Sequence, residues 1–253
     1  MRFRRSWRNI IKKKVKLPYK RINVDLKRQI KYTLWTMKYK AVIFDMDGTL
    51  IDSEIHWNAI EPGVWHKFGI ELTPELSQRI TGLNISDTYN AIIHPLNPSL
   101  SLEYVTQCYT EASTSLYEEG CQLLPGAREF IQVLHQHGIL MSIGSSSPDE
   151  RINFIRKRFH LEEMIQLYAS TQSLGLPGKP DPAVFQYLIK KYGVSPDDVV
   201  VFEDSTHGLV AAKASGAYTI AILDPRWNHG DASIADMKIT TWLDQHLYRQ
   251  LGL

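Results

Sequence analysis

The chain has 253 residues, of which 43% are hydrophobic and 22% are charged, and it contains only two cysteines. This composition is typical of a globular protein with a sizeable core, and Cys108 and Cys121 are too few for a disulfide framework, which fits a reducing compartment. No segment approaches the run of about eighteen apolar residues that a membrane-spanning helix needs. We therefore expect a cytoplasmic protein.

Charge is distributed unevenly along the chain. Residues 1–40 hold 15 lysines and arginines and a single acidic residue, Asp25, whereas residues 41–253 hold 14 basic and 26 acidic residues. The basic extension over residues 1–36 has three interpretations. It is a dispensable or mis-started extension ahead of Met37, a disordered arm that contacts nucleic acid or anionic lipid, or a targeting peptide, which its lack of an apolar segment disfavours.

After Lys40, short apolar runs alternate with amphipathic helical patterns. The runs expected to form strands are Ala41–Phe44, Ile139–Ile143, Leu167–Ala169, Val199–Phe202 and Tyr218–Leu223. The helical patterns between them cover Ala127–His137, Asp149–Phe159, Ala183–Tyr192 and Thr206–Ser215. Continuously apolar strands separated by helices predict an α/β fold, a Rossmann-like parallel sheet with helices on both faces.

One segment interrupts this alternation. Residues 53–122 contain several helical patterns but no convincing buried strand, and about seventy residues are too many for a simple connection. We therefore predict a small helical cap domain over residues 53–122, inserted after the first strand. The catalytic core is then formed by residues 37–52 and 123–253.

Charged and hydroxyl side chains stand where the predicted strands end, and ligands of open α/β sheets bind outside those ends. The residues are Asp45 and Asp47 after the first strand, Ser145 and Ser146 after the second, Lys179 in a later loop, and Glu203 and Asp204 after the fourth. Ser145 and Ser146 precede a predicted helix, and a serine with the backbone N–H groups at a helix N-terminus can bind an anion. Lys179 lies in a stiff Gly-Lys-Pro turn. Together they predict a phosphate-sized site.

The four acids form a set of hard oxygen donors. A single aspartate at a strand end is often a helix N-cap, but four acids at matching strand ends favour a shared ligand. Asp45 and Asp47 face the same way if the chain is extended there, and neighbouring carboxylates favour a divalent cation. All-oxygen coordination, completed by Glu203 and Asp204, favours Mg²⁺ over zinc.

These motifs resemble those of the haloacid dehalogenase superfamily. They are, in order, Asp-Met-Asp-Gly-Thr at residues 45–49, Ser145, Gly-Lys-Pro-Asp-Pro at residues 178–182 and Val-Phe-Glu-Asp-Ser-x-x-Gly at residues 201–208. The resemblance covers roughly residues 37–240. Residues 44–54 are similar to the β-phosphoglucomutase-like branch with a helical cap, which includes the sugar-phosphate phosphatases.

The resemblance implies a phosphoric monoester hydrolase. By its pattern Asp45 would attack phosphorus and become an aspartyl-phosphate, and Asp47 would act first as general acid and then as general base. The second aspartate argues against a dehalogenase. The implied ligands are Asp45, the main-chain carbonyl of Asp47, Asp204 and Glu203 for Mg²⁺, and Ser145, Ser146 and Lys179 for the phosphoryl group.

The cap is expected to set the substrate. Many relatives carry an arginine after Thr-Gly-Leu that grips a second phosphate, whereas this chain has Asn84 after residues 81–83. We therefore expect a phosphorylated small metabolite, in particular a sugar monophosphate, with Glu54, Trp57 and Asn84 as candidate cap contacts, and a monomeric enzyme. The alternatives are a β-phosphoglucomutase-type mutase and a binding protein that uses its basic arm on nucleic acid.

Overall fold

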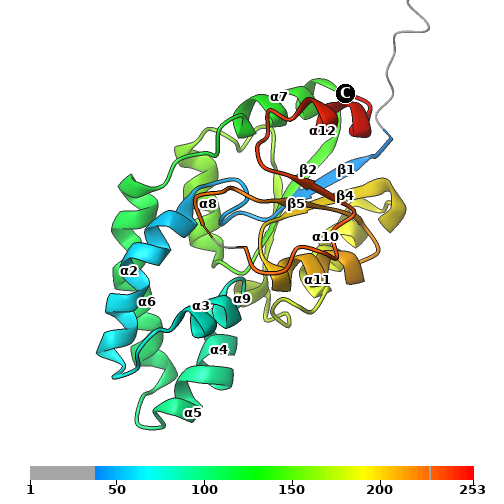
Figure 1. The fold of residues 1–253 in the computed structure, drawn as a ribbon. Helices are drawn as coiled ribbons and strands as arrows, with labels where there is room; N and C mark the ends of the chain where they lie inside the picture. The colour runs from blue at the N-terminus through cyan, green and yellow to red at the C-terminus, as the bar shows by residue number, and fades with distance from the viewer. Residues whose placement is uncertain (1–37, 228) are drawn as a thin grey trace, which may run out of the picture. The chain divides into compact units, whose positions relative to one another are not determined.

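The computed structural model describes residues 38–227 and 229–253, so the basic extension and every prediction made for it lie outside the described residues. A six-stranded sheet in the order β3-β2-β1-β4-β5-β6 forms the centre of the core, and all its neighbouring strands are parallel (Figure 1). The strands are β1 (Ala41–Phe44), β2 (Leu140–Ser145), β3 (Leu167–Ser170), β4 (Val199–Glu203), β5 (Tyr218–Ile222) and β6 (Met237–Ile239).

Helices cover both faces of this sheet. Successive side chains of a strand point to opposite faces, and in β1 Val42 and Phe44 lie in one buried apolar cluster while Ala41 and Ile43 lie in another. The first cluster includes α7 (Ala127–Gln136), α8 (Asp149–Arg158) and α12 (Gln245–Leu251), and the second includes α10 (Ala183–Tyr192) and α11 (Thr206–Ala214). The predicted α/β fold is confirmed.

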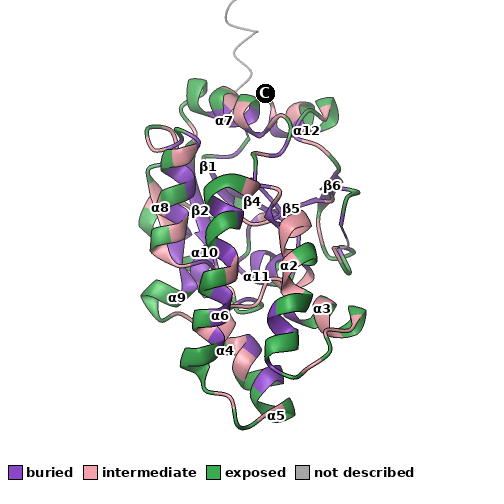
Figure 2. Ribbon diagram, turned by 90° about the vertical axis from the view of Figure 1, so that its left-hand side faces the viewer, coloured by how far each residue is buried: buried purple, intermediate pink, exposed green. Residues whose placement is uncertain are grey.

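The segment between β1 and α7 is helical, which confirms the predicted insertion. Its elements are α2 (Ser53–Lys67), α3 (Pro74–Ile80), α4 (Ile85–Thr88), the π-helix η1 (Tyr89–Ile93), α5 (His94–Leu96), α6 (Leu102–Ser115) and the π-helix η2 (Leu116–Gly120). Residues of α2, α3, α4, η1 and α6 form an apolar cluster of their own around Trp65 and Phe68, whereas the buried residues of η2 belong to the core cluster. Buried residues occur along α2 (Figure 2). We call residues 53–122 the cap; its exact boundaries stay a prediction.

Short elements escaped the sequence patterns. They are β6, α9 (Thr171–Leu174), α12 and the 3₁₀ helix η3 (Pro196–Asp198). Three to seven residues hold too few apolar positions to establish a period. Among the helices that the structure describes, none is long and apolar enough to cross a membrane.

Candidate active site

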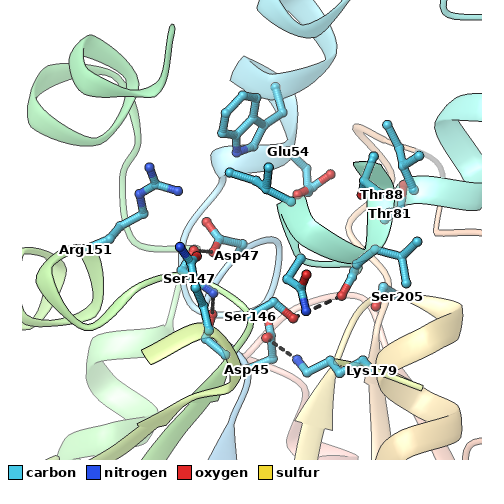
Figure 3. Close-up of a pocket in the computed structure, with 18 of the residues that line it drawn as sticks. Asp45, Asp47, Glu54, Thr81, Thr88, Ser146, Ser147, Arg151, Lys179 and Ser205 are labelled. Atoms are coloured by element: carbon cyan, nitrogen blue, oxygen red, sulfur yellow. Dashed lines mark hydrogen bonds and ion pairs between the residues drawn. The ribbon is translucent and has the colours of Figure 1, made fainter. Parts of the chain in front are cut away.

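Residues at strand ends and in one loop converge on a pocket between the sheet edge and the cap (Figure 3). Asp45 is the first residue after β1, Ser145 is the last of β2, and Glu203 is the last of β4, followed by Asp204. Lys179 reaches the same place from the loop between α9 and α10. All five side chains are buried although each is ionisable or polar, so the charges of the site interact more strongly than charges in water do.

Lys179 joins two of the acids. Its Nζ lies 2.5 Å from Oδ1 of Asp45 and 2.5 Å from Oε1 of Glu203. Burial lowers the pKa of Lys179, but the two carboxylates outweigh burial and hold that pKa above its ordinary value. Lys179 is therefore a fixed positive charge beside Asp45.

Three acids form a group that could hold a metal ion. One carboxylate oxygen from each of Asp45, Glu203 and Asp204 lies within 4.8 Å of the others. Asp204 accepts a hydrogen bond from the indole nitrogen of Trp227 at 3.2 Å and faces His229 at 3.5 Å. The Glu203 carboxylate is also held in place, because its Oε2 accepts the backbone N–H groups of residues 204 and 205, each at 2.9 Å.

The charge of this group fits a divalent cation. Burial, reinforced by neighbouring carboxylates, raises the pKa of Asp45, Glu54 and Asp204, and in Asp45 this outweighs the opposing effect of Lys179. A buried carboxylate stays ionised only when positive charge balances it, and one ammonium cannot balance so many. Hard oxygen ligands in a negatively charged pocket are the donors that Mg²⁺ prefers.

Two glycines leave the room that these carboxylates occupy. Gly48 has a φ of +73°, and a Cβ atom there would lie 2.1 Å from Oδ2 of Asp204. A Cβ on Gly208, in the first turn of α11, would lie 1.8 Å from Oε1 of Glu203. The glycine of each motif is thus required by the close approach of a carboxylate.

Asp47 points away from the acid group. Its Oδ1 accepts a hydrogen bond from the hydroxyl of Tyr117 at 2.6 Å, and its Oδ2 accepts one from the hydroxyl of Ser147 at 2.9 Å. Any part that Asp47 takes in holding a metal therefore falls to its main-chain carbonyl. Tyr117 and Ser147 were not predicted as site residues, since an aromatic residue at helical spacing normally signals packing alone.

The three serines of the loop after β2 have different partners. The Ser145 hydroxyl accepts the backbone N–H of Ser147 at 3.0 Å, which shapes the loop. The Ser146 hydroxyl donates to the carbonyl oxygen of Gly82 in the cap at 3.1 Å. Both serines line the pocket, as expected for phosphate-binding residues, but Ser146 contacts the cap in this arrangement.

The candidate cap residues Glu54, Trp57 and Asn84 also line the pocket. Both ends of the Asn84 amide are engaged in capping α4, because it accepts from the backbone N–H of Asp87 at 2.8 Å and donates to the Asp87 carboxylate at 2.7 Å. Glu61, which lies two turns beyond Glu54 on α2, lines the pocket too and was missed. Its helical spacing from Glu54 was the available signal.

Comparison with known proteins agrees with this geometry. The family model of the haloacid dehalogenase-like hydrolases matches residues 42–222, which contain every strand-end motif described above. The chain belongs to the haloacid dehalogenase-like hydrolases. It is a phosphatase of that family, a phosphoric monoester hydrolase in the capped branch that holds β-phosphoglucomutase and the sugar phosphatases.

Two curated relatives and one solved structure illustrate the likeness of this phosphatase. Hexitol phosphatase B of Escherichia coli K12 is 34% identical over 207 residues, which are 79% of this chain and 91% of that protein. The phosphorylated carbohydrates phosphatase of Thermotoga maritima is 30% identical over 193 residues, 76% of this chain and 89% of that protein. CbbY from Rhodobacter sphaeroides, crystallised with phosphate, shares the fold with a TM-score of 0.68 at 22% identity, covering 81% of this chain and 95% of CbbY.

Proposed function

We propose that this phosphatase hydrolyses monophosphate esters of small, hydroxyl-rich, otherwise uncharged molecules, sugar or sugar-alcohol monophosphates above all. The observation that carries this proposal is the charge of the pocket. On the side formed by the strand ends, Lys179 lies beside Asp45. The described cap residues that line the pocket include Glu54 and Glu61 but no lysine, arginine or histidine.

In the proposed reaction the two aspartates have different roles. The Asp45 carboxylate forms a bond to phosphorus as the bond from phosphorus to the leaving oxygen breaks, and Asp47 gives that oxygen a proton. Asp47 then takes a proton from a water molecule, whose oxygen bonds to phosphorus as the bond to Asp45 breaks. Lys179 and Ser145 hold the phosphoryl oxygens, and Lys179 balances negative charge that develops on them.

Mg²⁺ fits the group of Asp45, Glu203 and Asp204, since their oxygens are close together, buried and in excess of the positive charge. When bound, Mg²⁺ would supply further positive charge against the phosphoryl oxygens. Two of these acids are held by hydrogen bonds: Lys179 donates to Glu203, and Trp227 donates to Asp204.

The cap residues that line the pocket support a monophosphate as the substrate. A second phosphate near the cap would find no cation among the described cap residues that line the pocket. The remaining pocket cation, Arg151 of α8, donates to the Ser113 hydroxyl at 2.6 Å and stacks on Tyr117. Carboxylates and amides are good acceptors for sugar hydroxyls. The names of the two curated relatives, a hexitol phosphatase and a carbohydrate phosphatase, support the same class.

The test is phosphate release with Mg²⁺ from matched substrates: sorbitol 6-phosphate, glucose 6-phosphate, fructose 1,6-bisphosphate and AMP, with the Asp45→Asn variant as blank. We expect kcat/KM for the hexose or hexitol monophosphates to exceed that for the bisphosphate by about tenfold or more. Equal or better turnover of the bisphosphate contradicts the proposal. Conversion of β-glucose 1-phosphate to glucose 6-phosphate without net phosphate release would favour the mutase instead.

A further inference from the structure

Two hydrogen-bonded chains of indole, phenol and carboxylate join α2 to the helix formed by α6 and η2. In the first, Nε1 of Trp65 donates to the hydroxyl of Tyr109 at 2.7 Å, and that hydroxyl donates to Glu61 at 2.9 Å. All three residues belong to the cap. This chain therefore links cap residues to one another.

The second chain has the same chemistry but leaves the cap. Nε1 of Trp57 donates to the hydroxyl of Tyr117 at 3.1 Å, and that hydroxyl donates to Oδ1 of Asp47 at 2.6 Å. Trp57 lies eight residues before Trp65, and Tyr117 eight residues after Tyr109, so the two chains lie at different levels of the same helix pair. The second chain thus connects the cap to the proposed acid and base of the core.

The direction of this hydrogen bond is determined by the groups themselves. An indole N–H only donates, so the Tyr117 oxygen must accept from Trp57 and is left with its own O–H to give. Oδ1 of Asp47 lies 2.6 Å from this buried hydroxyl and accepts its hydrogen bond. Tyr117 therefore links the position of Trp57 to the orientation of Asp47.

Tyr117 is itself held from the core side. The guanidinium of Arg151, on α8, lies 4.3 Å from the centre of the Tyr117 ring and donates to the hydroxyl of Ser113 on α6 at 2.6 Å. Figure 3 places Arg151 and Asp47 on the same side of the pocket. Ser147 of the core holds the other oxygen of Asp47 at 2.9 Å, so that carboxylate is fixed by one donor from the core and one from the cap.

We propose that Tyr117 is a positioning residue that makes proton transfer by Asp47 depend on the placement of the cap helices. When α2 and η2 lie as described here, Tyr117 turns Asp47 toward the pocket; when they move away, Asp47 loses one of its two donors. The proposal rests on the proposed function of Asp47 as acid and base.

The test compares Tyr117→Phe with Tyr109→Phe, which removes an equally buried, indole-bonded cap hydroxyl that does not contact Asp47. The readout is kcat/KM for an alkyl phosphate, sorbitol 6-phosphate, and for p-nitrophenyl phosphate. A nitrophenolate leaves without being protonated, so forming the aspartyl-phosphate from it needs little help from Asp47. We expect Tyr117→Phe to lower kcat/KM about 10- to 100-fold for the alkyl phosphate and less than about threefold for the aryl phosphate. Tyr109→Phe removes a hydroxyl that contacts Glu61 in the pocket lining but not Asp47, so it should change kcat/KM of the two substrates by the same factor.

Equal losses on both substrates, or equal behaviour of the two tyrosine variants, would overturn the positioning role. Asp47→Asn separates this failure from that of the proposed function: if Asp47→Asn itself spares the alkyl phosphate, Asp47 is not the acid. If Tyr117→Phe does not fold, Trp57→Phe replaces it, because it keeps the Tyr117 hydroxyl but removes the donor that orients it. The same substrate-dependent loss is then expected, and its absence counts against the proposal.

Discussion

The ammonium nitrogen of Lys179 lies 2.5 Å from Oδ1 of Asp45, although 134 residues separate the two in the chain. Both side chains are buried at the carboxyl edge of the sheet. A carboxylate must be ionised to attack phosphorus, and burial alone would favour its protonated form. The contact therefore places one positive charge beside the proposed nucleophile, but burial still raises the pKa of Asp45, so a bound cation would be needed as well to keep its carboxylate ionised.

Replacing the proposed nucleophile should abolish turnover without unfolding the protein. Asp45→Asn retains the shape and one acceptor but cannot form an aspartyl-phosphate, so we expect phosphate release to fall by about 10³-fold or more. Circular dichroism and the thermal midpoint should show a folded protein. Asp52→Asn is the matched control, since Asp52 accepts from the backbone N–H of Gln122 and does not line the pocket. Substantial residual release by Asp45→Asn would remove its assigned role.

Metal removal should stop the reaction. The single ammonium group of Lys179 cannot balance the buried carboxylates of the site, so we expect catalysis to need a bound cation. EDTA is expected to abolish phosphate release and added Mg²⁺ to restore it. Asp204→Asn should raise the Mg²⁺ concentration that gives half-maximal rate by about tenfold or more. Trp57 lines the pocket from the cap, so Trp57→Phe should alter substrate preference but have little effect on the Mg²⁺ concentration that gives half-maximal rate. Full activity of the wild-type protein in EDTA is the result that would refute the metal assignment.

A methyl group at Gly208 should disable the site, since it would collide with the Glu203 carboxylate. Displacing Glu203 also frees Lys179, and misplacement by about 1 Å commonly costs about 100-fold in rate. We expect Gly208→Ala to lower kcat by that order. Gly63→Ala is the control: Gly63 lies in α2 with no atom within 4 Å of an added Cβ, so the change should stabilise the protein by about 0.5–1 kcal/mol. Normal activity in Gly208→Ala would show that Glu203 need not stay where it is.

Glu61 should make stability fall as the pH rises. Burial raises the pKa of Glu61 from its ordinary 4.5 to about 7, against the opposing hydrogen bond from Tyr109. The folded state therefore holds this proton more tightly than the unfolded chain does. The resulting contribution to the free energy of unfolding is fully present below pH 4.5 and is lost as the pH rises through about 7.

Urea unfolding of the wild type and of Glu61→Gln at about pH 4.5 and about pH 8 measures this contribution, because glutamine accepts from Tyr109 but does not ionise. Relative to Glu61→Gln, the wild type should lose up to about 3 kcal/mol between the two pH values. Parallel pH dependence of the two proteins would mean that Glu61 titrates alike in the folded and unfolded states.

The fold class and the residues at the strand ends could be predicted from the sequence alone. Strands and helices are recognised from local periods, and a parallel sheet brings the carboxyl ends of its strands to one edge. Asp45, Ser145, Lys179, Glu203 and Asp204 could thus be grouped before any distance was known. Each of these residues lies at the end of a predicted strand or in a stiff turn, and this position places its side chain at the carboxyl edge of the sheet.

The surroundings of these groups depend on contacts between distant parts of the chain. The hydrogen bond from Tyr117 to Asp47 spans 70 residues, and that from Trp227 to Asp204 joins a loop to the end of β4. An aromatic side chain has the same helical spacing whether its polar atom is used or not, so no local pattern distinguishes Tyr117 from a packing residue. The orientation of Asp47 depends on how the cap helices pack against one another and on α8, and that packing is a property of the folded chain.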